Sequence, residues 1–229
     1  MLYFPENDRS YLQPLDDRYH DLLVNSTSGQ AIQKLLKDFI FDTILDVGCG
    51  AGWHTRHFAN RGKTVTALDY SKHAELNVAE FSNQSVEFKF QDVMEFSTNI
   101  QFDALWCSHV LEHQPNPNLF LMKLHSLVRE EGVLAITVPP LKNEIVGGHV
   151  TLWNAGLLLY QLALAGFDCR EAAILKYAYN ISIIVRKKTI NHNLLLGFSN
   201  GDIEKLAPFL PTGNLKQGFN GNISIHNWY

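Results

Sequence analysis

A glycine-rich segment, Asp46-Val-Gly-Cys-Gly-Ala-Gly52, has the residue types best suited to binding a ligand. Glycines allow a tight turn, so Gly48, Gly50 and Gly52 permit close approach of a ligand to the backbone. The spacing is GxGxG, whereas a diphosphate-binding turn has GxGxxG. Asp46 lies two residues before the first glycine, where a carboxylate repels a diphosphate and attracts an ammonium or sulfonium group. The segment therefore predicts a site for a positively charged ligand.

Two further carboxylates follow apolar runs that have the length of strands. Asp69 lies about twenty residues beyond the glycine turn, where a carboxylate can accept hydrogen bonds from both hydroxyls of a ribose. Tyr70 is placed to lie against an adenine. Asp92 can accept a bond from the adenine amine, with Val93 packing on the ring. The alternatives are helix capping for Asp69 and an ordinary solvated loop position for Asp92.

Two histidines are candidates for a general base, because imidazole titrates near neutral pH. His113 follows the fourth predicted strand, and His149 lies between the fifth strand and the next helix. Both loops are expected to face the ligand crevice. The alternative for each histidine is that it only bonds backbone and orders its loop. Glu112 is expected to order its loop, and Trp153 to be core or a pocket wall.

Alternating apolar runs and helical patterns position these residues. Strands are predicted at residues 44–47, 64–68, 86–90, 103–107 and 133–138, and helices from Ser28 to Phe39 and at 53–60, 72–81, 118–128 and 154–165. This alternation indicates a doubly wound α/β sheet with its crevice at the carboxyl ends of the strands. Residues 167–175 and 177–185 are separated by a short link, so they are predicted to be antiparallel strands.

The tail from Thr189 contains one further helical pattern, at residues 202–209. We expect an N-terminal arm over residues 1–27, a main domain over 28–188 and a C-terminal extension over 189–229 packed on the same domain.

Composition excludes several classes of protein. The 229 residues carry a formal net charge of −4, which gives no attraction for nucleic acid. The basic strip Arg186-Lys-Lys188 is interpreted as a solvated strand end. The three cysteines (Cys49, Cys107 and Cys169) lack zinc-site spacing, so no metal site is predicted and reduced thiols in the cytoplasm are expected. No signal peptide or membrane span is apparent, and the oligomeric state is left open.

The order of these motifs resembles the class I S-adenosylmethionine-dependent methyltransferases, in particular their small-molecule branch. The resemblance covers residues 28–187 and becomes specific in Phe102–Pro117, which reads FDALWCSHVLEHQPNP, and in the strand that ends Val138-Pro-Pro140. It implies a Rossmann-like seven-stranded sheet with its last strand antiparallel. It also implies S-adenosyl-L-methionine as cofactor.

The same resemblance implies roles for individual residues. Asp46 and the three glycines would line the methionine end of the cofactor, and Asp69 would hold the ribose. Asp92 and Val93 would flank the adenine. Ser108 and His109 would place backbone beside the cofactor. Trp53 and His54 depart from the pattern, which often has a smaller or hydroxyl residue there.

The tail gives the only indication of an acceptor. Residues 202–211, 218–223 and 227–228 resemble tails of bacterial methyltransferases associated with surface-polysaccharide assembly. The leading prediction is O-methylation of a sugar, a glycan precursor or another small-molecule hydroxyl. The alternatives are N- or C-methylation of another metabolite, a nicotinamide-dependent oxidoreductase and a binding module without catalysis. The GxGxG spacing and Asp46 disfavour the oxidoreductase, and the acids at three strand ends disfavour the binding module.

Overall fold

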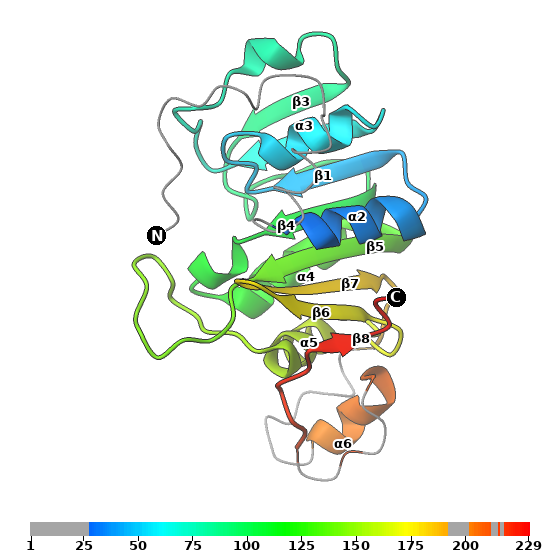
Figure 1. Cartoon of the computed structure of the whole chain (residues 1–229). Coiled ribbons are helices and arrows are strands. Elements are labelled where there is room, and N and C mark those ends of the chain that lie inside the picture. The colour runs from blue at the N-terminus through cyan, green and yellow to red at the C-terminus, as the bar shows by residue number, and fades with distance from the viewer. Residues whose placement is uncertain (1–27, 192–201, 212–214, 216–217) are drawn as a thin grey trace.

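An eight-stranded sheet forms the centre of the protein in the computed structural model, which describes residues 28–191, 202–211, 215 and 218–229 (Figure 1). The arm predicted over residues 1–27 lies outside these ranges. The sheet has the order β3-β2-β1-β4-β5-β7-β6-β8. Its strands are β1 (Thr43–Val47), β2 (Thr64–Asp69), β3 (Val86–Phe90), β4 (Phe102–Ser108), β5 (Val128–Val138), β6 (Ala173–Tyr177), β7 (Asn180–Arg186) and β8 (Ile225–His226).

The sheet is parallel from β3 to β5 and antiparallel beyond it. Strands β1 to β5 pair in parallel, and β7 enters between β5 and β6 in the opposite direction. This arrangement confirms the doubly wound fold with an antiparallel strand. The predicted count of seven was one short, because β8 adds two residues that pair with Ile174 and Leu175 of β6. So short a strand has no sequence periodicity that could predict it.

Helices cover both faces of the sheet (Figure 1). They are α2 (Gly29–Asp38), α3 (Trp53–Ala59), α4 (Pro117–Leu127), α5 (Ala155–Leu164) and the short α6 (Asp202–Leu206), with 3-10 turns η2 (Val78–Phe81), η3 (Leu111–His113) and η5 (Ala207–Phe209). Ile44 belongs to the apolar cluster that contains α2 and α3, whereas its neighbour Leu45 belongs to the cluster that contains α4 and α5. Successive strand residues point to opposite faces, so one buried strand supplies both cores. Among the helices described, none has the length and apolar character needed to cross a membrane.

Several predicted elements were wrong in extent. The strand expected over residues 133–138 begins earlier, at Val128, and the strand expected from residue 177 begins at Asn180. The helix expected over residues 72–81 is only the turn η2, because the segment before it bonds locally: the Glu75 amide donates to His73 Nδ1 at 3.3 Å. The strand expected from Phe167 begins at Ala173. There the Asp168 carboxylate accepts a bond from the Arg170 amide at 3.1 Å, which makes a turn where a strand was predicted.

The basic strip is a solvated strand end only in part: Arg186, the last residue of β7, is exposed, whereas Lys187 is buried. Its ammonium group donates to the carbonyl oxygens of His125 and Val128 at 2.8 and 2.9 Å. These carbonyls belong to the last turn and the C-cap of α4. A cation satisfies free carbonyls and complements the negative end of a helix, so Lys187 ties β7 to α4.

Candidate functional site

The predicted ligand-binding residues lie at one edge of the sheet. The glycine turn follows β1, and Asp69, Asp92 and Ser108 end or follow β2, β3 and β4. These four strands are parallel neighbours, so their carboxyl ends meet at the same edge. This edge is where open α/β sheets bind ligands.

The glycine turn needs glycine for two different reasons. Gly48, Gly50 and Gly52 all have positive φ, at 74°, 51° and 81°. A Cβ added to Gly48 would lie 2.3 Å from Val110 Cγ2, so this glycine lets the turn pack against the loop after β4. A Cβ on Gly50 would meet no described atom within 4 Å. Gly50 therefore faces open space, where a ligand can approach the backbone.

Asp46 is a buried carboxyl group inside β1, with a side chain only 1% exposed. Its Oδ2 accepts a hydrogen bond from Thr55 Oγ1 at 2.6 Å. Burial, with Asp69 close by, raises the pKa of Asp46 to about 7 despite that bond. Among the residues that the structure describes, the carboxylate form has no positive partner, and a cationic ligand would supply one.

Asp69 shapes the glycine turn as well as facing the crevice. Its Oδ2 accepts a bond from the Gly50 amide at 2.8 Å, and its Oδ1 accepts one from the Ser71 amide at 3.3 Å. Tyr70 is 80% exposed, so one face of the ring is available to a ligand. The alternative of helix capping does not apply, because no helix follows Ser71 and the segment 72–81 contains only the turn η2. The carboxylate instead stabilises the local backbone, a role that is compatible with ribose binding.

Asp92 also has a local backbone bond. It is exposed, and its Oδ1 accepts the Met94 amide hydrogen at 2.8 Å. The neighbouring Val93 is buried beneath the loop. Asp92 retains its second carboxylate oxygen for a ligand, and Val93 supplies an apolar floor.

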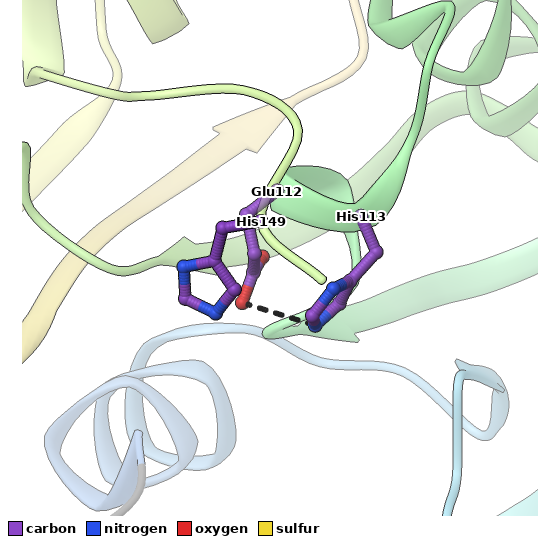
Figure 2. A group of neighbouring side chains, drawn as sticks. All are labelled: Glu112, His113 and His149. Atoms are coloured by element: carbon purple, nitrogen blue, oxygen red, sulfur yellow. Dashed lines mark ion pairs between the residues drawn. The ribbon is translucent and has the colours of Figure 1, made fainter. Parts of the chain in front are cut away.

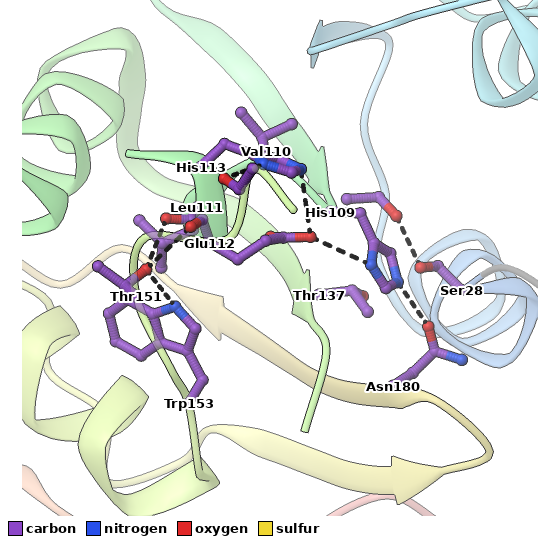
Figure 3. A network of polar contacts seen from close by, with 12 residues as sticks. Ser28, His109, Val110, Leu111, Glu112, His113, Thr137, Thr151, Trp153 and Asn180 are labelled. Atoms are coloured by element: carbon purple, nitrogen blue, oxygen red, sulfur yellow. Dashed lines mark hydrogen bonds and ion pairs between the residues drawn. The ribbon is translucent and has the colours of Figure 1, made fainter. Parts of the chain in front are cut away.

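His109 is held firmly at the end of β4 (Figure 3). It has a positive φ of 56°, and its Nε2 lies 2.9 Å from Asn180 Oδ1. Its Nδ1 lies 3.3 Å from Glu112 Oε1. Burial alone lowers the pKa of His109, but Glu112 and Asn180 outweigh burial and raise it. Next to it, Ser108 Oγ lies 2.7 Å from Ser28 Oγ, which joins β4 to the start of α2.

The two candidate bases lie side by side, together with Glu112 (Figure 2). One potential ligand atom from each of Glu112, His113 and His149 lies within 4.8 Å of the other two. The rings of His113 and His149 are edge to face, with centroids 5.0 Å apart. Partial burial lowers the pKa of His149, an effect that Glu112 opposes. The residues come from two loops that are 36 positions apart in sequence, and the arrangement can hold a metal ion although the sequence predicted no metal site.

Backbone contacts fix the loop that carries His149 (Figure 3). The amides of Val150 and Thr151 donate to the Glu112 carbonyl at 2.9 and 3.2 Å. Thr151 Oγ1 donates to the Leu111 carbonyl and accepts a bond from Trp153 Nε1 at 2.9 Å. Trp153 is 2% exposed, so of the two roles expected for it, core or pocket wall, it has the first. The loop is therefore tied to η3 on one side and to the core on the other.

The sequence did not reveal the partners of the site residues. Thr55 bonds Asp46, and Asn180 bonds His109, yet neither stands out in sequence from other polar residues. The unusual His54 accepts a bond from the indole of buried Trp106 at 3.1 Å. His54 therefore satisfies a core side chain, which accounts for its departure from the expected residue type.

Comparisons with known proteins agree with this geometry. Residues 45–136 match the family described as "Methyltransferase domain". The ubiquinone biosynthesis O-methyltransferase of Dechloromonas aromatica is 36% identical over 95 residues, which cover 39% of this chain and 40% of that protein. The enzyme of the same name from Actinobacillus pleuropneumoniae is 29% identical over 126 residues, which cover 49% and 52%. The matches thus span only about half the length of these relatives.

Solved structures share the fold. The 1,6-didemethyltoxoflavin-N1-methyltransferase of Burkholderia thailandensis, bound to S-adenosylhomocysteine, has a TM-score of 0.60 at 21% identity, over 69% of this chain and 76% of that one. The N-methyltransferase NodS of Bradyrhizobium japonicum, also bound to S-adenosylhomocysteine, has a TM-score of 0.60 at 16% identity, over 80% and 93%. Residues 45–136 therefore match a methyltransferase domain, and the chain has the fold of the class I S-adenosylmethionine-dependent methyltransferases, which its motifs resemble.

Proposed function

We propose that the protein transfers the methyl group of S-adenosylmethionine to a hydroxyl oxygen of a small molecule. The observation that carries this proposal is the buried Asp46 beside a glycine turn that is open at Gly50, at the ligand-binding edge of the sheet. The names of the relatives, which are O-methyltransferases, support oxygen as the atom methylated.

The cofactor occupies this edge in the order that the motifs suggested. Asp46 and the turn of Gly48, Gly50 and Gly52 face its charged methionine end. Asp69 accepts bonds from the ribose hydroxyls, and Tyr70 covers the adenine. Asp92 and Val93 flank the adenine, and Ser108 and His109 present backbone beside the donor. Each residue lies at a carboxyl strand end, as this placement requires.

The chemistry needs positioning more than activation, because a sulfonium methyl group is already electrophilic. The protein holds the acceptor oxygen in line with the carbon–sulfur bond. The oxygen–carbon bond forms while the carbon–sulfur bond breaks, and its electron pair goes to sulfur. The hydroxyl proton passes to an imidazole nitrogen of His149 or His113, whose loops border the end of β4.

A pocket near this edge supports a small polar acceptor such as a sugar. It has a volume of about 200 Å³ and lies between residues 140–141 after β5, the start of α5 and the tail. Asn154, Lys176 and, from the tail, Asn222 supply its polar groups, beside apolar residues such as Leu141 and Ile181. Amides and an ammonium group suit an acceptor rich in hydroxyls. The tail residues that prompted the sugar proposal thus contribute to a pocket.

Cofactor titration tests the proposal directly. We expect calorimetry to show binding of S-adenosylhomocysteine and none of NADH or NAD⁺, because Asp46 repels a diphosphate. Transfer of a labelled methyl group to an oxygen in a screen of sugars, nucleotide sugars and phenols would support the full proposal. Label on nitrogen or carbon would contradict O-methylation, and binding of a dinucleotide in place of S-adenosylhomocysteine would overturn the methyltransferase assignment.

The pKa of Asp46 makes cofactor affinity depend on pH. With a free-protein pKa of about 7, the group must lose its proton to bind a cationic donor, so affinity rises with pH and falls below pH 7. One pKa unit corresponds to tenfold, so we expect the dissociation constant to be roughly thirtyfold larger at pH 5.5 than at pH 8. Calorimetry across this range measures the change.

Asp46→Asn is the matched variant, since it keeps the shape of the side chain and removes its titration. It should bind the donor weakly at every pH. A wild-type affinity that is constant from pH 5.5 to pH 8 would show that the donor's charge does not meet Asp46.

A further inference from the structure

Glu112 is a buried carboxylate whose environment is incomplete. Its side chain is 1% exposed, and neither carboxylate oxygen accepts a hydrogen bond from the residues that the structure describes. His109 Nδ1 approaches Oε1 to 3.3 Å (Figure 3). His113 Nε2 approaches the same oxygen to 3.9 Å (Figure 2). A buried carboxylate is stable only when a positive charge and hydrogen bonds compensate for its lost hydration. Two imidazole nitrogens at these distances compensate for it only in part.

His113 presents a lone pair toward this carboxylate. Its Nδ1 lies 2.7 Å from the Gly148 carbonyl oxygen. A carbonyl can only accept, so Nδ1 carries the hydrogen and donates it. In the neutral ring, Nε2 is then the atom with the free lone pair, and Nε2 is the atom nearest Glu112. An imidazole that donates one N–H to a backbone carbonyl and aims its other nitrogen inward has the usual arrangement of a metal-binding histidine.

The third group comes from the loop that also supplies this carbonyl. Gly148 has a φ of 80°, and the next residue, His149, brings its ring edge to face against His113. Since the Glu112 backbone holds Val150 and Thr151, the loop cannot move away without losing these bonds. The position of His149 is therefore fixed relative to the carboxylate.

We propose that Glu112, His113 and His149 form a binding site for a divalent transition-metal cation. Two imidazoles and one carboxylate are a donor set that suits Zn²⁺, Co²⁺ or Fe²⁺ and leaves coordination positions open. Ligand atoms of one cation at about 2.0–2.2 Å lie roughly 3–4 Å apart, so small side-chain rotations bring these three atoms, now within 4.8 Å, to a common ion.

The cation gives the two histidines a different role from that of a base, and this part of the inference rests on the proposed function. A hydroxyl that binds a divalent cation has a lowered pKa, so an acceptor hydroxyl loses its proton to water near neutral pH. Methyl transfer then proceeds as before, with the new carbon–oxygen bond forming as the carbon–sulfur bond breaks. The histidines hold the ion, and the ion binds the acceptor oxygen. The proton goes to water rather than to a histidine.

Cobalt titration tests the site without any turnover. Protein free of a histidine tag is stripped with EDTA, dialysed and titrated with Co²⁺. We expect visible absorption that saturates at one ion per chain. Glu112→Gln, His113→Ala and His149→Ala should each weaken Co²⁺ binding by at least about tenfold. His226→Ala, on the distant strand β8, is the matched control and should bind as wild type does.

The outcomes separate the site from the proposed function. S-adenosylhomocysteine binding is measured by calorimetry in EDTA. Cofactor binding with no Co²⁺ spectrum, or with equal Co²⁺ affinity in wild type and His149→Ala, overturns the metal site and leaves the methyltransferase proposal standing. Co²⁺ binding without cofactor binding overturns the methyltransferase proposal and leaves the metal site standing. If Glu112→Gln fails to fold, His149→Ala still decides, because its side chain lies in a partly exposed loop.

Discussion

Replacing His149 with alanine is expected to lower kcat by about 10²–10⁴ while leaving the affinity for S-adenosylhomocysteine within about twofold. The side chain lies beside His113, in a loop separate from those that carry the glycine turn and Asp69. Its loss removes the group that takes or displaces the acceptor's proton and leaves the cofactor contacts intact. Steady-state kinetics with an acceptor identified by the methyl-label screen, together with calorimetry, measures both quantities.

Two further measurements locate the cause. His226→Ala should retain wild-type kcat, because β8 pairs with the far side of β6. EDTA should abolish wild-type turnover if Glu112, His113 and His149 hold a cation. It should leave turnover unchanged if His149 is itself the base. A fully active His149→Ala enzyme would remove this histidine from catalysis in either role.

Alanine at two neighbouring glycines is expected to damage different properties. Gly48→Ala should lower the free energy of unfolding by more than about 2 kcal/mol, because positive φ alone costs about 1–2 kcal/mol for a residue with Cβ and the new methyl would lie 2.3 Å from Val110 Cγ2. Gly50→Ala adds only the backbone cost, since its methyl enters open space. We propose that the cofactor approaches through that space, so Gly50→Ala should weaken S-adenosylhomocysteine binding by about tenfold or more.

Gly62 supplies the control for backbone strain. Its φ is 73°, an added Cβ would meet no described atom within 4 Å, and it lies in the turn between α3 and β2. Gly62→Ala should therefore lose about as much stability as Gly50→Ala, measured by urea unfolding, and keep wild-type cofactor affinity. Equal losses of stability at Gly48 and Gly62 would mean that Val110 yields to the added methyl group.

Much of the fold could be predicted because local pattern and tertiary role agree. The buried strand Thr43–Val47 and the amphipathic helix Gly29–Asp38 both show their periodicity in sequence. The prediction failed where polar side chains bonded their own backbone, as at His73 and Asp168, because apolar spacing does not report such bonds. Lys187 was misjudged for a related reason, since only the position of α4 shows which carbonyls receive its ammonium group.

The sequence by itself determined the edge of the sheet at which the predicted ligand-binding residues meet. Parallel strands necessarily bring their carboxyl ends together, so the glycine turn, Asp69 and Asp92 had to meet once the strands were recognised. The tertiary structure alone decided that Glu112 is buried and lies against His113 and His149. That meeting depends on a long loop folding back onto the Glu112 carbonyl, and backbone hydrogen bonds between distant segments leave no periodic trace in a sequence.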